Sequence, residues 1–176
     1  MLLDRLFRPR PAQAVGRALY ARVVDRSRGR ALYADLGVPD TVEGRFEAYS
    51  LHLVLLLDRL RGHGELATEV SQSLFDTYVS SLDHALREMG VGDLSVGRKM
   101  RKLGEALYGR GKSYDAAFAS LPDSGLLQAL LVRTIYAETD AAAAPGLVAY
   151  ILATRDALAV QPLERLLAGE VEWAAA

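Results

Sequence analysis

Several features are missing from this sequence, and each absence excludes a class of protein. There is no cysteine, which excludes disulfide bonds, thiolate metal sites and cysteine nucleophiles. The most apolar stretch, LHLVLLL at residues 51–57, is far shorter than the roughly 20 residues that a membrane-spanning helix needs. Neither sign of charge is in excess, with 21 basic and 22 acidic residues, so only a local patch could bind nucleic acid.

The first residues also lack the features of a targeting signal. MLLDRLFRPRPAQ is charged and has no continuous apolar core, which argues against a secretory signal peptide. Arginine accounts for most of the basic residues and alanine is abundant, which is typical of GC-rich genomes. We therefore expect a bacterial protein of the cytoplasm.

What is present is helical periodicity. Apolar residues recur at spacings of three and four along most of the chain, whereas β-branched residues are sparse and alternation with period two is rare. The length of 176 residues suits one domain, and the apolar content of 51% allows a substantial core. We predict an all-α fold, a single compact domain of six to seven helices with an N-terminal arm.

Glycine, proline and capping residues set the expected boundaries. The predicted helices cover residues 12–25, 41–61, 65–88 and 95–120, with a loop over residues 26–40, and later helices begin at Ser124, Pro145 and Pro162. Asp40 is predicted to cap the second helix, with Glu43 as its capping-box partner. We expect residues 1–30 to form a basic arm with the first helix, residues 31–168 the helical domain, and residues 169–176 a frayed tail.

The fourth predicted helix carries a cluster of cations. Its apolar face consists of Val96, Met100, Leu103, Leu107, Tyr114 and Phe118. The predicted partner-binding residues are Arg98, Lys99, Arg101, Lys102, Arg110 and Lys112. Only Glu105 is expected to offset these cations, and the helix macrodipole disfavours positive charge in the first turns. The cluster is therefore either a solvated face or a surface for an anionic partner such as RNA, lipid head groups or an acidic protein.

Two segments make the chain recognisable. LREMGVGDLSVGRKMRKLGEALYGR, residues 86–110, and GVPDTVEGRFEAYSLHLVLLLDRL, residues 37–60, resemble the ubiquinol–cytochrome c chaperone family. The resemblance covers residues 30–140, and the chain from about residue 141 adds little to it. The positions singled out as matching the family pattern are Glu43, Gly44, Arg45, Phe46, Met89, Gly90, Gly92, Asp93 and Tyr108.

The resemblance implies an assembly factor and not an enzyme. Members of this family help newly made cytochrome b into the cytochrome bc1 complex, so cytochrome b is the expected partner and no cofactor is expected. Further candidate partners are the ribosome, an anionic membrane surface at the inner membrane and a second assembly factor, whereas DNA is not expected. The alternative prediction is an RNA- or ribosome-binding helical domain that acts through its basic surface.

The remaining candidate sites have plainer interpretations. His52 is predicted to be a core residue, His63 a loop residue, and His84 a surface partner of Glu88, so no metal site is expected. Glu43 and Glu47 are four residues apart but lack the ExxH partner of a di-iron bundle. The glycines of GVGDLSVG link two helices and do not follow a strand, which argues against dinucleotide binding.

Aromatic residues and glycines leave two further alternatives open. The aromatic residues at core spacings are Tyr49, Phe75, Tyr78, Tyr108, Tyr114 and Phe118. Packing is the expected role for them, and a hydrophobic groove for a client segment is the alternative. Gly104, Gly109 and Gly111 each weaken a helix by about 1 kcal/mol relative to alanine, which indicates close helix approach or a local kink.

Overall fold

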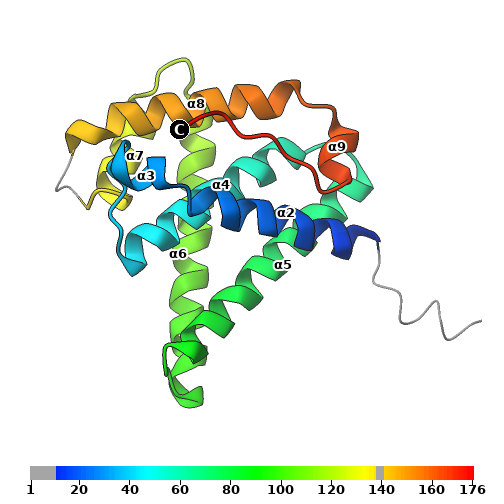
Figure 1. The fold of residues 1–176 in the computed structure, drawn as a ribbon, viewed down its shortest axis with the longest axis vertical. Coiled ribbons are helices and arrows are strands. Elements are labelled where there is room, and N and C mark those ends of the chain that lie inside the picture. Colours follow the sequence, from blue (N-terminus) through cyan, green and yellow to red (C-terminus); the bar gives the residue numbers. More distant parts are fainter. Residues whose placement is uncertain (1–10, 138–140) are drawn as a thin grey trace, which may run out of the picture.

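The computed structural model describes residues 11–137 and 141–176, and all regular structure in those ranges is helical (Figure 1). The elements are α2 (Pro11–Ser27), α3 (Arg30–Ala34), α4 (Val42–Leu60), α5 (Glu65–Glu88), α6 (Asp93–Ala119), α7 (Gly125–Thr134), the 3-10 turn η1 (Ala141–Ala143), α8 (Ala144–Val160) and α9 (Leu163–Leu167). The predicted all-α fold is confirmed. The part of the predicted arm that precedes the first helix, residues 1–10, lies outside the described residues.

All seven predicted helices are present, and α3 is an addition. It lies in the segment that was predicted to be a loop, and its five residues are too few to show a period. Leu32 is the only buried residue of this helix. Pro145 is the second residue of α8, whereas Pro162 is the N-cap of α9 and not its first residue.

The cap of α4 differs from the prediction by one residue. Thr41 is the N-cap, and its hydroxyl accepts a hydrogen bond from the Gly44 N–H at 3.1 Å. An N-cap side chain must reach the third residue of the helix, and Asp40 lies one position too early for that. Asp40 instead forms an ion pair with Arg45 at 2.6 Å. Because Asp40 is not the N-cap, the predicted capping box of Asp40 and Glu43 does not form.

Helix α4, which contains the most apolar stretch of the sequence, is the centre of the domain. Residues 50–56 are all buried, and α2, α5, α6 and α8 pack around this helix. Helix α2 lies closely on α5, where a Cβ on Gly16 would be 2.4 Å from the Ser73 hydroxyl oxygen. The first helix is therefore part of the helical body and not of an arm.

The far end of the α5–α6 pair projects beyond the other helices (Figure 1). Apolar residues at spacings of four along α5, Val70, Leu74 and Tyr78, are buried where α2 packs on this helix. At the turn beyond α5 the surface is open, and Met89 is 56% exposed. Within the described ranges, no helix combines the length and the apolar content that crossing a bilayer requires.

The C-terminal segment, residues 169–176, is not frayed as expected. It runs back from α9 towards α8 in an extended path (Figure 1). The Gln161 side chain forms two hydrogen bonds with the backbone of Glu172, and Trp173 packs edge-on against the His52 ring. Specific contacts at two points therefore hold the segment in place.

Candidate functional site

The glycine-rich turn between α5 and α6 fixes how the two helices meet. Gly90 has a φ of +79°, a left-handed conformation that favours glycine. Its N–H donates to the Arg87 carbonyl at 2.9 Å, and the Val91 N–H donates to the Leu86 carbonyl at 3.1 Å. This pair of bonds is a Schellman motif, which ends α5 sharply. Gly92 then serves as the N-cap of α6, so the turn has the structural role expected for both glycines.

Acidic residues near this turn already have partners. Arg87 binds the carboxylates of Asp83, at 2.7 Å, and of Asp93. His84 lies 3.2 Å from Glu88, which confirms the predicted surface pair. These five acidic or basic groups are thereby satisfied among themselves, and the acids do not reach the cations further along α6.

The cluster Arg98, Lys99, Arg101 and Lys102, here called the α6 cationic cluster, is exposed to solvent. None of its side chains takes part in an ion pair with any other described residue. On the opposite side of the helix, Val96 and Leu107 are buried. Burial of the apolar face therefore directs the four cations outward, and partner binding by them stays a prediction.

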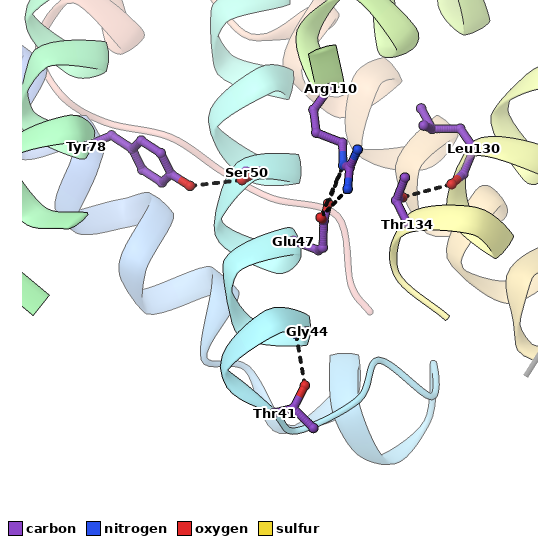
Figure 2. A network of polar contacts seen from close by, with 8 residues as sticks. All are labelled: Thr41, Gly44, Glu47, Ser50, Tyr78, Arg110, Leu130 and Thr134. Atoms are coloured by element: carbon purple, nitrogen blue, oxygen red, sulfur yellow. Dashed lines mark hydrogen bonds and ion pairs between the residues drawn. The ribbon is translucent and has the colours of Figure 1, made fainter. Parts of the chain in front are cut away.

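Arg110 differs from the expected uncompensated cation (Figure 2). Its Nε and Nη2 atoms donate to both carboxylate oxygens of Glu47 at 2.7–3.1 Å, and these hydrogen bonds raise the pKa of Arg110. The Glu47 side chain is only 8% exposed. The pair therefore ties α4 to α6 inside the protein. An acid on the apolar face of the second predicted helix was the sequence signal for this contact, and the sequence interpretation missed it.

Tyr108 is the aromatic residue for which the prediction of core packing is wrong, because it is 67% exposed. It follows the buried Leu107 by one residue, a rotation of about 100° that turns it out of the buried face. Lys112 lies on the same outer surface, with its Nζ atom 4.6 Å from the centroid of the Tyr108 ring. The other five aromatic residues of that set are buried or packed against the core, as predicted.

Glycines leave one side of α6 open. A Cβ on Gly97, Gly104 or Gly111 would meet nothing within 4 Å, and the same holds for Gly109. Helix α6 is continuous, so these glycines make no close helix contact in the described structure. The spacing of seven residues places Gly97, Gly104 and Gly111 along one face, together with Tyr108.

The family-pattern residues at the start of α4 have structural roles. A Cβ on Gly44 would lie 1.9 Å from the Pro39 carbonyl oxygen, so only glycine fits there. Phe46 packs against the core, and Arg45 lies over the Tyr33 ring at 5.5 Å in addition to its ion pair. Glu43 is exposed in the first turn of the helix.

His52 is a buried core histidine, as predicted. Its Nδ1 atom lies 2.7 Å from the Ala48 carbonyl oxygen, which can only accept, so Nδ1 carries the proton. The Tyr150 hydroxyl therefore donates to Nε2, at 2.7 Å. Burial lowers the pKa of His52 to about 4. His63 lies exposed in the turn after α4, and the described residues contain no group of three or more side chains that could hold a metal ion.

The depression between α2 and α5 has a volume of about 700 Å³. Polar side chains such as Gln72, Asp76 and Ser80 line it. None of the aromatic residues that left a hydrophobic groove open as an alternative lines this depression. Tyr49 and Tyr78 line a second depression of about 540 Å³, so the hydrophobic groove stays an alternative. The outer surface of α6 is the candidate interaction site whose exposure the sequence predicted and the structure shows.

Comparison with known proteins places the chain in a family. The model for the ubiquinol–cytochrome C chaperone matches residues 34–173. This chain belongs to the ubiquinol–cytochrome c chaperone family. The match includes α8 and α9, so the C-terminal part contributes more to the family pattern than the sequence resemblance indicated.

A solved structure agrees with this assignment over nearly the whole chain. The crystal structure of the Cbp3 homolog from Brucella abortus is 35% identical, with a TM-score of 0.86. The alignment covers 99% of this chain and 97% of that chain. A comparison with curated proteins finds no match.

Proposed function

We propose that this member of the ubiquinol–cytochrome c chaperone family is a non-catalytic chaperone. It binds newly synthesised cytochrome b during assembly of ubiquinol–cytochrome c reductase. Family membership supports the assembly role. The observation that supports a binding surface is the α6 cationic cluster, which is exposed and has no acidic partner among the described residues.

This surface has properties that weaken the isolated protein. Like charges four residues apart on a helix, such as Arg98 and Lys102, are destabilising by about a few tenths of a kcal/mol. Glycine inside a helix costs about 1 kcal/mol relative to alanine, and Gly97 and Gly104 lie in open space where alanine would fit. An acidic partner helix along this face offsets both costs. Its carboxylates neutralise the cations, and the glycines allow the partner helix to approach α6 closely. The client segment is therefore a helix with acidic residues beside its contact face.

Charge reversal tests the proposal. In the α6 variant, glutamate replaces each of Arg98, Lys99, Arg101 and Lys102. In the control, glutamate replaces four other exposed cations, Arg17, Arg22, Arg30 and Arg133, so the two variants have the same net charge. Each replaces the native chain in cells, with folding checked by circular dichroism. Assembly is measured on native gels and contact with cytochrome b by site-specific crosslinking from α6.

We expect the α6 variant to lose crosslinking and assembly while the control keeps both. Normal assembly with the α6 variant would refute a role for the cationic cluster. The RNA-binding alternative predicts a different result: steeply salt-dependent RNA binding by the purified protein, lost in the α6 variant while the cytochrome b crosslink is retained. The ribosome, an anionic membrane surface and a second assembly factor stay proposals as additional partners of the same cations.

A further inference from the structure

The C-terminal segment, residues 169–176, is bound to the helical body much as a separate peptide would be. It has no regular secondary structure and crosses the surface of the bundle (Figure 1). Gly169 marks its start, with a φ of +82°, and a Cβ there would lie 2.7 Å from the Ala18 Cβ. Beyond this residue the segment contacts a set of side chains of the helical body, here called the groove: Arg26, His52, Gln161 and Arg165.

The part-buried polar contacts are directed at the backbone of the segment. The Gln161 carboxamide accepts from the Glu172 N–H and donates to the Glu172 carbonyl, both at 2.8 Å. Two residues further on, Arg26 donates to the carbonyl of Ala174. Contacts of this kind recognise an extended chain whatever its side chains are, as strand addition does.

Side-chain recognition comes from one aromatic residue and from acidic residues around it. The Trp173 ring stands edge-on to the His52 ring, with centroids 5.2 Å apart and an interplanar angle of 88°. Arg165 binds Glu170 at 3.1 Å and Glu172 at 2.8 Å. These ion pairs are exposed and contribute little on their own. The aromatic side chain therefore sets the preference for a ligand, and the acidic residue before it adds only a weak contact.

The groups that bind the segment are held in place without it. Gln161 also donates to the Ala157 carbonyl at 2.8 Å, and its side chain is anchored to α8 by that bond. Arg26 donates through Nε to the Tyr150 hydroxyl at 2.8 Å, and Tyr150 in turn donates to His52 at 2.7 Å. Because Gln161 and Arg26 each have a second partner in the helical body, these two groups keep their positions when the segment leaves.

We propose that this groove is a binding site for an extended peptide, which the chain's own C-terminal segment occupies in cis. Its other occupant is an extended segment of a second polypeptide, with an aromatic residue in the place of Trp173 and an acidic residue before it. The chain's own segment and the segment of the second polypeptide compete for the same contacts with Gln161, Arg26 and the His52 ring. This proposal does not depend on the function proposed for α6.

The test uses the full chain and a fluorescein-labelled peptide, GEVEWAAA, as the probe. Trp173→Ala weakens the native segment without altering the groove. We expect this variant to bind the probe at least ten-fold more tightly than the native chain, as measured by fluorescence anisotropy. A peptide with alanine in place of tryptophan, or a scrambled peptide, is expected to bind at least ten-fold more weakly. Adding Gln161→Ala to the variant is expected to remove probe binding.

Two results would overturn the proposal. One is a folded Trp173→Ala chain that does not bind the probe, or that binds the scrambled peptide equally well. The other comes from amide exchange in the native chain and does not depend on any variant. We expect the Glu172 N–H to exchange at least a hundred-fold faster than the amides of α4, and equal rates would mean that the segment opens only on global unfolding. The α6 charge-reversal variant serves as a further control, with unchanged probe binding.

Discussion

The ion pair of Glu47 and Arg110 allows a sharp test, because its two side chains are buried to different extents. The exposed fraction is 8% for Glu47 and 26% for Arg110. In Arg110→Met the carboxylate stays in the interior without a partner, whereas in Glu47→Gln the guanidinium can turn towards water. Isolating one member of a buried pair costs several kcal/mol, so we expect about 3 kcal/mol for Arg110→Met and about 1 kcal/mol for Glu47→Gln.

Urea unfolding followed by far-UV circular dichroism measures both losses. The matched control is Arg61→Met, which removes an ion pair with Asp115 whose side chains are 60% and 43% exposed. That variant is expected to lose less than about 1 kcal/mol. Equal losses for Arg110→Met and Arg61→Met would refute the reasoning.

Three further predictions concern capping, backbone fit and a buried titratable group. Thr41→Ala is expected to cost about 1 kcal/mol of unfolding free energy and Asp40→Ala less than about 0.5 kcal/mol, since only the first removes the cap; equal costs would contradict the cap assignment. Gly44→Ala is expected to destabilise by about 2 kcal/mol or more through overpacking, whereas Gly104→Ala stabilises by about 1 kcal/mol, and thermal unfolding compares the two. Burial lowers the pKa of His52 to about 4 from 6.5, so the unfolded chain binds more protons between these values and stability falls as the pH is lowered through that window. The wild type is expected to lose about 3 kcal/mol more than His52→Gln from pH 6.5 to 4, and parallel pH profiles would exclude His52 as the cause.

The long helices could be predicted from the sequence because their buried faces are long enough to show a period. Helix α4 is the clearest case, since its continuous apolar run required contacts on several sides and has them. Helix α3 could not be found in this way, because five residues make little more than one turn. The position of residues 169–176 was equally hidden, since its backbone contacts with Gln161 and Arg26 leave no pattern in the side chains.

The candidate site shows where a helical projection is sufficient and where it fails. The projection correctly directed the α6 cationic cluster away from the core. It does not say which other helix lies beside each position, so the pairing of Arg110 with Glu47 was not foreseen. Tyr108 was misplaced for a simpler reason: residue type was given more weight than its angle to Leu107.

The projecting end of the α5–α6 pair has a consequence for how this family can diversify. The outer face of α6 contributes little to the core, and the glycines there have open space around them. Substitutions on that face change the charge and shape of the surface with little effect on the core, so this part of the sequence can vary while the rest preserves the scaffold.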